Sequence, residues 1–540
     1  TQGSPTDDIP TLNVGSERTF TRTEKTAYRI LSGFGRVNYN YNMKYLLSFT
    51  ARYDGISRLK DNRWGFFPGV SVGWNIMEED FWKESKVSDI VSNLKPRISY
   101  GVNGNVNGIG NYEVYGEYAQ VDAKTYGGAT ALYNKKLLNT NLRWEQSQTF
   151  EVGLDIGFLQ NRLSFILDFY SRRTKDLLTK QALPGYTGFS DIVTNMGTLR
   201  NSGFEAEVKA NIINKGGFTW DMTANITSVA NKIIALPYNN VENNRVGGYE
   251  VAAGKVDTNG KFPTKWIAGR QEGGKLGELV GYRQQHVFKD WDDVKQHANL
   301  RVDEVANLYG PGLADQINPA TGKTYKESSG WQPIEPGDAC WEDINGDNII
   351  NGYDRSVMGN IFPNVTGGFS TTFGYKGLSL YARFDYALGH TLYNDLKARS
   401  LGQYQGQFNI ITDVKDMWSE ANPNSDLTKF YYADQLAKKN ITRSNNASTA
   451  ADNNSSRYYE KGDYLALREV TLSYQLPKSL ISKVHMTDAS VYVTGQNLFY
   501  ITGYGGVSPE PAVSTTYGRG IDNGRYPTPR TLLFGLSLTF

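Results

Sequence analysis

Hydrophobic and polar residues alternate in short segments along much of this chain. The last segment, 530–540, shows the pattern most clearly, because five large apolar residues share one face and only Leu533 interrupts the other. A repeat of two residues indicates a β-strand, and the segment has the ~9–11 residues of a tilted membrane strand. In a soluble sandwich it would be an uncovered edge strand, which is prone to aggregation. The five apolar residues are Leu532, Phe534, Leu536, Leu538 and Phe540.

The same alternation predicts thirteen strands in all. Four of them end by Val102, four more end by Ile226, two flank Lys376-Gly377, and three lead to Phe540. The connections between the strands alternate between short and long. Membrane barrels have short turns on the periplasmic side and long loops outside, whereas a soluble sandwich has no reason to sort its loops in this way. The pattern therefore predicts an all-β protein with an antiparallel transmembrane barrel.

The predicted connections differ greatly in length. Residues 104–143 and about 170–199 are expected to form long loops, and residues 1–26 are expected to be irregular. Two larger polar insertions, at about 231–364 and 390–462, are expected outside the cell, and the first is too long to lack structure of its own. Tight turns are predicted at Asn42-Met43, Gln160-Asn161 and Lys376-Gly377.

The two faces of the predicted strands differ in charge. A soluble barrel could not bury the charged residues of the polar face without partners, whereas a wide polar lumen can hold them. We therefore expect Phe158, Trp220, Leu380 and Phe534 to face lipid, and Glu207, Asp221 and Arg383 to face the lumen. A register slip of one residue would invert every one of these assignments.

Composition narrows the class further. The 540 residues have a mean hydropathy of −0.49 and contain no run near the ~20 apolar residues of a membrane helix, which excludes a helical membrane protein. Aromatic residues make up 13%, which suits interfacial girdles or ligand stacking. The net charge of +2 gives no indication of a nucleic-acid partner, and the single Cys340 excludes an intrachain disulfide.

Eight stretches, in order along nearly the whole chain, resemble the SusC/RagA-type TonB-dependent outer-membrane transporters. The resemblance implies a barrel of about 22 strands when complete, a separate N-terminal plug and a TonB-contacting segment. It further implies a SusD-like surface lipoprotein as partner, and import of oligosaccharides or peptides rather than enzymatic activity. The stretches are LSGFGRVNYNYNMKYLLSFTARYDGISRL, NRWGFFPGVSVGWNIMEEDF, LKPRISYGVNGN, NSGFEAEV, DINGDNIINGYDRSVMGNIFPNVTGGF, YLALREVTLSYQL, VYVTGQNLF and YPTPRTLLFGLSLTF.

The sequence departs from this family in showing no plug and no TonB-contacting segment. Thirteen strands with an external start also differ from a complete bacterial barrel, which has an even number of strands. We therefore expect residues 1–540 to be the C-terminal portion of a longer barrel. The strands at 29–41 and 530–540 should then not pair with each other.

One local motif, DINGDNIINGYD at 343–354, follows the order of an EF-hand calcium loop. Two residues depart from the pattern, since Asn348 replaces the usual glycine and Asp354 replaces the bidentate glutamate. The alternative is an Asx-turn loop, in which the side chains cap the backbone without a metal. The ligands would be the side chains of Asp343, Asn345, Asp347, Asn351 and Asp354 and the carbonyl of Ile349.

Catalytic groupings are absent from the sequence, because the four histidines are isolated and Cys340 has no histidine near it. Several aromatic residues in or near loops could instead stack on a sugar, although girdle positions or loop packing would explain them as well. These candidates are Trp64, Phe67, Trp331, Trp341 and Tyr504.

Two other kinds of function fit parts of the pattern. A passive porin or a surface adhesin barrel would share the strands, and a porin would conduct ions without TonB. A secreted, calcium-binding and carbohydrate-binding β-protein would be soluble without detergent, which the apolar stripes argue against.

Overall fold

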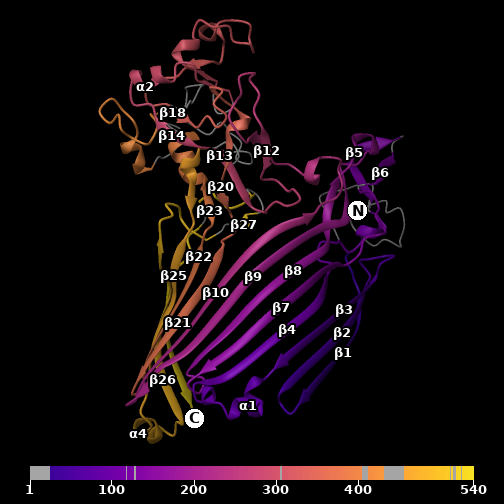
Figure 1. Cartoon of the computed structure of the whole chain (residues 1–540), viewed down its shortest axis with the longest axis vertical. Helices are drawn as coiled ribbons and strands as arrows, with labels where there is room; N and C mark the ends of the chain where they lie inside the picture. The colour runs from indigo at the N-terminus through magenta and orange to yellow at the C-terminus, as the bar shows by residue number, and fades with distance from the viewer. Residues whose placement is uncertain are drawn as a thin grey trace. The chain divides into compact units, whose positions relative to one another are not determined.

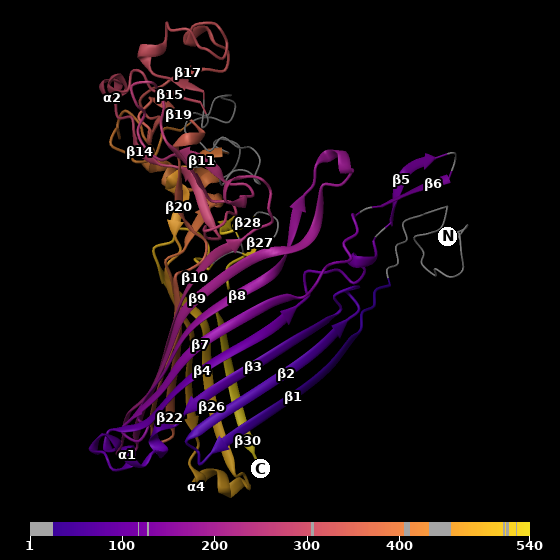
Figure 2. The same ribbon diagram turned by 45° about the vertical axis from the view of Figure 1, so that its right-hand side comes forward.

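The computed structural model describes residues 25–116, 118–126, 129–134, 136–303, 307–403, 411–430, 455–510, 513–514, 518–524 and 526–540. Most of the predicted irregular segment 1–26 lies outside these residues. The main element is an antiparallel sheet of thirteen strands among the described residues (Figures 1 and 2), so the predicted strand count is confirmed. Its order is β1-β2-β3-β4-β7-β8-β9-β10-β21-β22-β25-β26-β30.

The chain divides into two compact units, and the sheet strands are assigned to them as follows. The first unit contains β1 (Ile30–Tyr41), β2 (Tyr45–Ile56), β3 (Trp64–Trp74), β4 (Val91–Asn105), β7 (Glu145–Phe158), β8 (Leu163–Ala182) and the start of β9 (Asp191–Lys215). The second contains the rest of β9, most of β10 (Phe218–Ala235), and β21 (Val365–Tyr375), β22 (Leu378–Leu388), β25 (Tyr464–Gln475), β26 (Asp488–Thr502) and β30 (Thr531–Thr539).

Strand register places the apolar residues in continuous rows, as the alternation predicts. In the first unit, one row runs through Tyr39, Leu47, Val72, Ile98, Val152 and Phe169. Phe158 pairs with Val91 and Leu163 on the same face. In the second unit, another row runs through Trp220, Phe373, Leu380, Leu472, Val493 and Phe534. Many of these side chains are exposed, Phe534 to 81%, which is the expected state of a face covered by lipid.

The charged residues lie on the opposite face. Asp221 pairs with Thr372, one position away from the apolar pair of Trp220 and Phe373. Arg383 pairs with Ser370 and with Glu469. Glu207 is an even number of residues from Asn211 in β9, and the Asn211 amide donates to Asp221 Oδ1 at 2.5 Å. The three predicted polar-face residues are therefore on one side of the sheet.

The short turns have the backbone conformations that tight hairpins require. Asn42 and Met43 have φ of 48° and 58°, and Lys376 and Gly377 have φ of 47° and 88°. Positive φ at both central residues matches the twist of paired strands. Two other connections, at the same ends of the strands as these turns, contain short helices, α1 (Asp80–Lys83) and α4 (Lys478–Ile481).

Two predicted loops were wrong. Of residues 170–199, only 183–190 connect strands, because β8 and β9 continue as a long hairpin. Residues 104–143 contain a second hairpin, β5 (Tyr118–Tyr126) with β6 (Ala129–Asn134). Strands beyond the lipid pair through their backbones and do not need an apolar face, so the alternation that marks the other strands is missing there.

The first insertion carries its own structure, as its length predicts. It contains one α-helix, four short 3₁₀ helices and ten short strands among the described residues, and its core includes Phe288, Val294 and Trp341. The elements are β11 (Tyr249–Ala252), β12 (Thr264–Ile267), β13 (Glu278–Tyr282), β14 (Gln284–Val287), α2 (Trp291–Gln296), β15 (Arg301–Val302), β16 (Leu308–Tyr309), β17 (Gln332–Pro333), β18 (Ala339–Trp341), β19 (Ile349–Ile350) and β20 (Arg355–Asn360).

The second insertion and the last connection contain β23 (Thr391–Asn394), α3 (Asp395–Ala398), β24 (Tyr459–Lys461), β27 (Val513–Ser514), β28 (Gly518–Arg519) and β29 (Ile521–Asp522). Within the second unit, these elements gather at the ends of β22 and β25 that lie away from α4 (Figure 1). In the part of the chain that the structure describes, no helix has the length and apolar character needed to cross a membrane.

Candidate functional site

A bulge in β25 turns one arginine onto the polar face. Leu467 and Glu469 pair with residues of β22 and β26, but Arg468 between them has no partner in either ladder. A bulge inserts one extra residue and redirects its side chain. Arg468 consequently lies on the same face as Glu469, whereas regular alternation would place it with Val470 on the apolar face.

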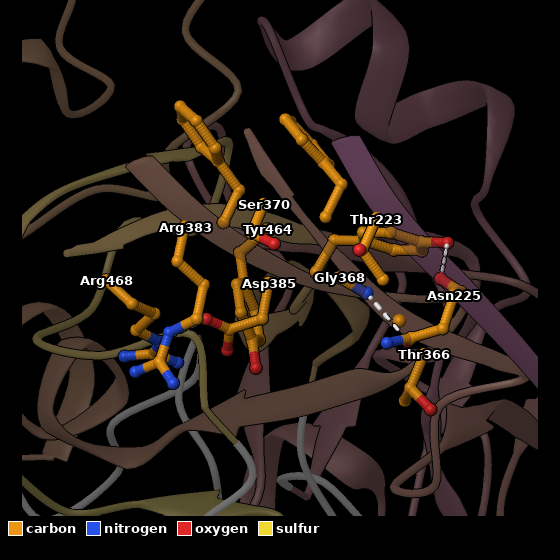
Figure 3. A pocket seen from close by; sticks show the side chains of 13 residues that line it. Thr223, Asn225, Thr366, Gly368, Ser370, Arg383, Asp385, Tyr464 and Arg468 are labelled. Carbon is orange, nitrogen blue, oxygen red and sulfur yellow. Dashed lines mark hydrogen bonds and ion pairs between the residues drawn. The ribbon is translucent and has the colours of Figure 1, made fainter. Parts of the chain in front are cut away.

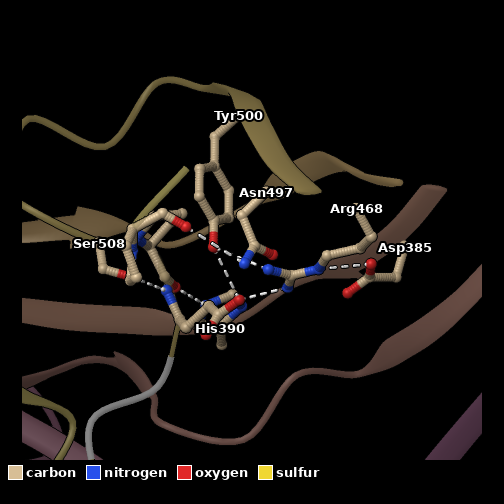
Figure 4. A network of polar contacts seen from close by, with 9 residues as sticks. Asp385, His390, Arg468, Asn497, Tyr500 and Ser508 are labelled. Carbon is tan, nitrogen blue, oxygen red and sulfur yellow. Dashed lines mark hydrogen bonds and ion pairs between the residues drawn. The ribbon is translucent and has the colours of Figure 1, made fainter. Parts of the chain in front are cut away.

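The Arg468 guanidinium joins two strands and a loop (Figure 4). Its Nε donates to Asp385 Oδ1 at 2.6 Å, and its Nη1 donates to the Tyr500 hydroxyl at 2.8 Å. Its Nη2 donates to Glu510 Oε1, which also accepts from the Tyr500 hydroxyl at 2.9 Å. Arg468 thus links β22, β26 and the connection that follows β26.

Arg468 also lines a cavity of about 570 Å³ on the polar face (Figure 3). Its charged lining consists of Arg383, Asp385 and Arg468, and the Tyr464 ring lies beside them. All of these residues belong to the second unit. Hydroxyl and amide groups complete the polar lining, contributed by Thr223, Asn225, Thr366 and Ser370.

A second cluster of charges lies on the polar face of the first unit. The Arg97 guanidinium contacts Glu151 at 2.8 Å, Asp155 at 3.2 Å and Asp168 at 2.6 Å. It lies over Gly153, since a Cβ at that position would be 2.5 Å from Arg97 Cζ. The absence of a side chain at Gly153 is therefore what allows one arginine to bridge β4, β7 and β8.

The 343–354 loop lies in the first insertion, as predicted, and its oxygens face the backbone. Asp343 accepts from the N–H groups of Gly346 at 2.7 Å and Asn348 at 2.8 Å, and Asp347 accepts from Ile349 at 2.8 Å. Asn348 has φ of 62°, which asparagine tolerates in place of glycine.

The C-terminal end of this loop is held by hydrogen bonds to the buried carboxylate of Asp354. Asp354 accepts from the N–H groups of Ile344 and Asn351, both at 2.9 Å. Burial raises the pKa of Asp354 to about 7, and the charges of Asp343 and Asp347 act in the same direction. Among the described residues, no three His, Cys, Asp or Glu side chains converge as a metal-binding group. The hydrogen bonds are those of the Asx-turn interpretation, and calcium binding stays a prediction.

Three of the five aromatic candidates are buried. Phe67 packs edge-on against Trp144, Trp341 is 2% exposed, and the Tyr504 hydroxyl donates to Asp522 at 2.8 Å. A ring must be accessible to stack on a sugar, so burial favours the packing interpretation for these three, and a role in binding stays a prediction.

The other two aromatic candidates keep part of their rings exposed. Trp64 stacks on Tyr53 on the apolar face, with ring centroids 5.1 Å apart, which is the environment of a girdle residue. Trp331 packs edge-on against Tyr325 and is half-buried. A role of Trp64 or Trp331 in binding stays a prediction.

The sequence indicated Arg383 as a polar-face residue but did not indicate Arg468 or Glu510. The run Tyr464-Leu-Ala-Leu-Arg468-Glu469 contains a local signal for the bulge, since regular alternation would turn one of its two adjacent charges toward lipid. Glu510 carries no signal of this kind, because its partner is far away in the sequence.

Comparisons with known proteins agree with a sheet that has one apolar and one polar face. The family model described as TonB dependent receptor-like, beta-barrel matches residues 1–331. The TonB-dependent receptor SusC of Bacteroides thetaiotaomicron is 30% identical over 536 residues, which cover 96% of this chain and 45% of that protein. TonB-dependent receptor P3 of Formosa agariphila is 29% identical over 519 residues, covering 95% and 45%.

Among solved structures, that of the RagAB peptide transporter matches with a TM-score of 0.69 at 23% identity, covering 99% of this chain and 50% of the other. This similarity shows the fold. The chain spans about half the length of the curated relatives that it matches. The chain belongs to the TonB-dependent receptor β-barrel family and is an integral β-barrel protein of the bacterial outer membrane.

Proposed function

We propose that this chain forms the C-terminal portion of the barrel of an energised importer, which takes up oligosaccharides or peptides with a SusD-like surface lipoprotein. The supporting observation is the 30% identity to the receptor SusC over 96% of this chain. The TonB complex would be reached through a plug-bearing N-terminal part of the longer protein. The family consists of transporters rather than enzymes.

The two faces of the sheet suit this role. Lipid covers the apolar rows, and the polar face holds the Arg97 cluster and the cavity beside Arg468. Membership of an outer-membrane family argues against the secreted alternative. The porin and adhesin alternatives share the same strands and have to be separated by experiment.

The test uses the full-length polypeptide that contains this sequence, purified from its host membrane in mild detergent. We expect a surface lipoprotein to co-purify, and uptake of labelled oligomers to stop when the proton gradient is dissipated. Ion conductance in a planar bilayer without TonB, together with the absence of a lipoprotein, would instead establish a passive porin. Cell attachment without uptake would indicate an adhesin.

We also propose calcium as a ligand of the 343–354 loop. An oxygen that accepts one N–H keeps a further lone pair, so the observed hydrogen bonds are compatible with coordination at ~2.3–2.6 Å. Calcium is expected to slow proteolysis of the first insertion relative to EDTA. Asp347→Asn should remove this difference and leave cleavage in EDTA unchanged. If calcium gives the wild-type protein no protection, only the Asx-turn interpretation remains.

A further inference from the structure

The partners of Arg468 are held in different ways. Asp385 lies on β22, which is paired with its neighbours in the sheet, so its position is fixed. Glu510 lies in the connection between β26 and β30, and 36% of its side chain is exposed. The segment is also tied down by His390, whose Nε2 donates to the Pro509 carbonyl at 2.9 Å. The Asp385 side chain is just as exposed, at 37%, so the two ion pairs differ in that Asp385 belongs to a paired strand and Glu510 to a connection.

The guanidinium does not depend on Glu510 for its position. It lies 5.3 Å from the centroid of the Tyr500 ring and 5.9 Å from that of the Tyr464 ring. The two rings meet edge to face, with centroids 5.8 Å apart. Only 16% of the Arg468 side chain is exposed. Asp385 and the two tyrosines would thus keep Arg468 in place if Glu510 moved away, leaving Arg468 Nη2 without its acceptor.

The lining of the cavity beside Arg468 includes two arginines and one carboxylate, Asp385. In the unliganded protein the Glu510 carboxylate, which contacts Arg468, balances the second positive charge. Arg383 is exposed and forms no hydrogen bond or ion pair with any described residue. An unpaired guanidinium at a solvent-filled cavity favours an anionic ligand, and arginine suits a carboxylate because it can donate two parallel hydrogen bonds.

We propose that Arg468 binds a carboxylate of the imported oligomer and that Glu510 occupies this position in the unliganded protein. A ligand carboxylate takes the place of the Glu510 carboxylate and accepts from Arg468 Nη2 and the Tyr500 hydroxyl, while the Glu510 side chain turns toward solvent. A second carboxylate on the ligand meets Arg383. This inference rests on the proposed function and narrows its substrate class to acidic oligomers, either uronate-containing glycans or acidic peptides.

Binding is measured by calorimetry on the purified full-length protein in detergent, with two pairs of probes. One pair is a tetramer of galacturonic acid with the neutral tetramer of galactose, and the other is a tetrapeptide of glutamate with that of glutamine. The acidic member of at least one pair should bind more tightly than its neutral counterpart, and increasingly so at low salt. The pair that shows this preference identifies the source of the carboxylate.

Two variants at the site should change affinity in opposite directions. Arg468→Gln should weaken binding of the acidic probe roughly tenfold or more, the value of a charge-assisted hydrogen bond. Glu510→Gln should strengthen it, because a neutral amide competes less well for the guanidinium. A purely structural ion pair would weaken binding in both variants. Arg383→Gln leaves the Arg468 contacts intact and should also weaken binding of the acidic probe, because it removes the partner of the second carboxylate.

The matched control is Arg52→Gln, which removes an equal charge from the polar face of β2, where Arg52 pairs with Asp54 at 2.6 Å. It should leave the affinity unchanged. Folding of every variant is checked by its heat-dependent migration in gels. Equal binding of acidic and neutral probes, no binding of either acidic probe, or weaker binding by Glu510→Gln would overturn the proposal. Since none of these measurements needs TonB or the lipoprotein, their outcome is separate from that of the uptake experiment.

Discussion

Replacement of Ile98 by arginine is expected to remove most of the protein from the outer membrane. Ile98 lies in the middle of β4, between Val72 and Val152 in the apolar row, and is 52% exposed. A charge at the lipid midplane costs ~2–4 kcal/mol, which is a large part of the stability of an ordinary domain. The measurement is the amount of heat-modifiable protein in purified outer membranes.

The matched control is Ser99→Arg, one residue further along the same strand. Ser99 pairs with Ser71 and Glu151 on the polar face, so the new guanidinium would meet water and a carboxylate. This variant should reach the membrane at the wild-type level. If Ser99→Arg is lost and Ile98→Arg is retained, the two faces of the sheet have been assigned the wrong way round.

Replacement of Gly153 by alanine is expected to destabilise the barrel by disrupting the Arg97 cluster. The new Cβ would lie 2.5 Å from Arg97 Cζ and 2.6 Å from Asp168 Oδ1, so the guanidinium has to lift away from its carboxylates. Because the Arg97 side chain is 29% exposed, water compensates for part of the loss. We expect the free energy of unfolding to fall by about 1–3 kcal/mol, as measured by urea titration in detergent.

Gly101 offers a control on the same face of β4. A Cβ at Gly101 would have no heavy atom within 4 Å, so Gly101→Ala should change the free energy of unfolding by less than roughly 0.5 kcal/mol. In an Arg97→Gln background, Gly153→Ala should lose part of its effect, since the clash with the guanidinium is gone while the approach to Asp168 Oδ1 remains. Equal unfolding midpoints for Gly153→Ala and Gly101→Ala would contradict this account.

Sequence patterns predicted the membrane-spanning part of the fold because lipid imposes a strong requirement on it. Each spanning strand must present apolar side chains on every second residue, and the row through Leu380 and Leu472 follows from that requirement alone. The turn at Asn42 could be predicted because asparagine tolerates positive φ and because this residue lies between two alternating segments.

Parts beyond the lipid could not be predicted in this way. The upper half of β8 includes Arg172, Arg173 and Lys175, which resemble a polar loop, although the backbone pairs with β7 as far as Gln146. Backbone hydrogen bonds do not depend on the side chains, so the sequence contains no signal for the extension. The ten strands of the first insertion are too short for a repeat of two residues to be recognised.

Alternation did not identify the Arg468 site, because the site depends on a bulge and on a residue that is distant in the sequence. The bulge breaks the alternation at Arg468 itself, so alternation assigns that residue to the wrong face. Glu510 approaches Arg468 only after the last connection has folded back over the sheet strands of its own unit. Burial of Phe67 and Trp341 is likewise a tertiary property, and residue type alone cannot distinguish a packing aromatic from a binding one.

The order of the sheet has a consequence for the kinetics of assembly. Every strand from β1 to β30 neighbours the strand before it in the chain, apart from the short elements of the connections. Strands can therefore join one at a time as hairpins, and most steps close only small loops. The pairing of β10 with β21 and of β22 with β25 must bring together ends separated by the two insertions, and closing longer loops costs more entropy. Because β13 pairs with β20 inside the first insertion, early folding of that insertion would shorten the effective loop and speed the slowest of these steps.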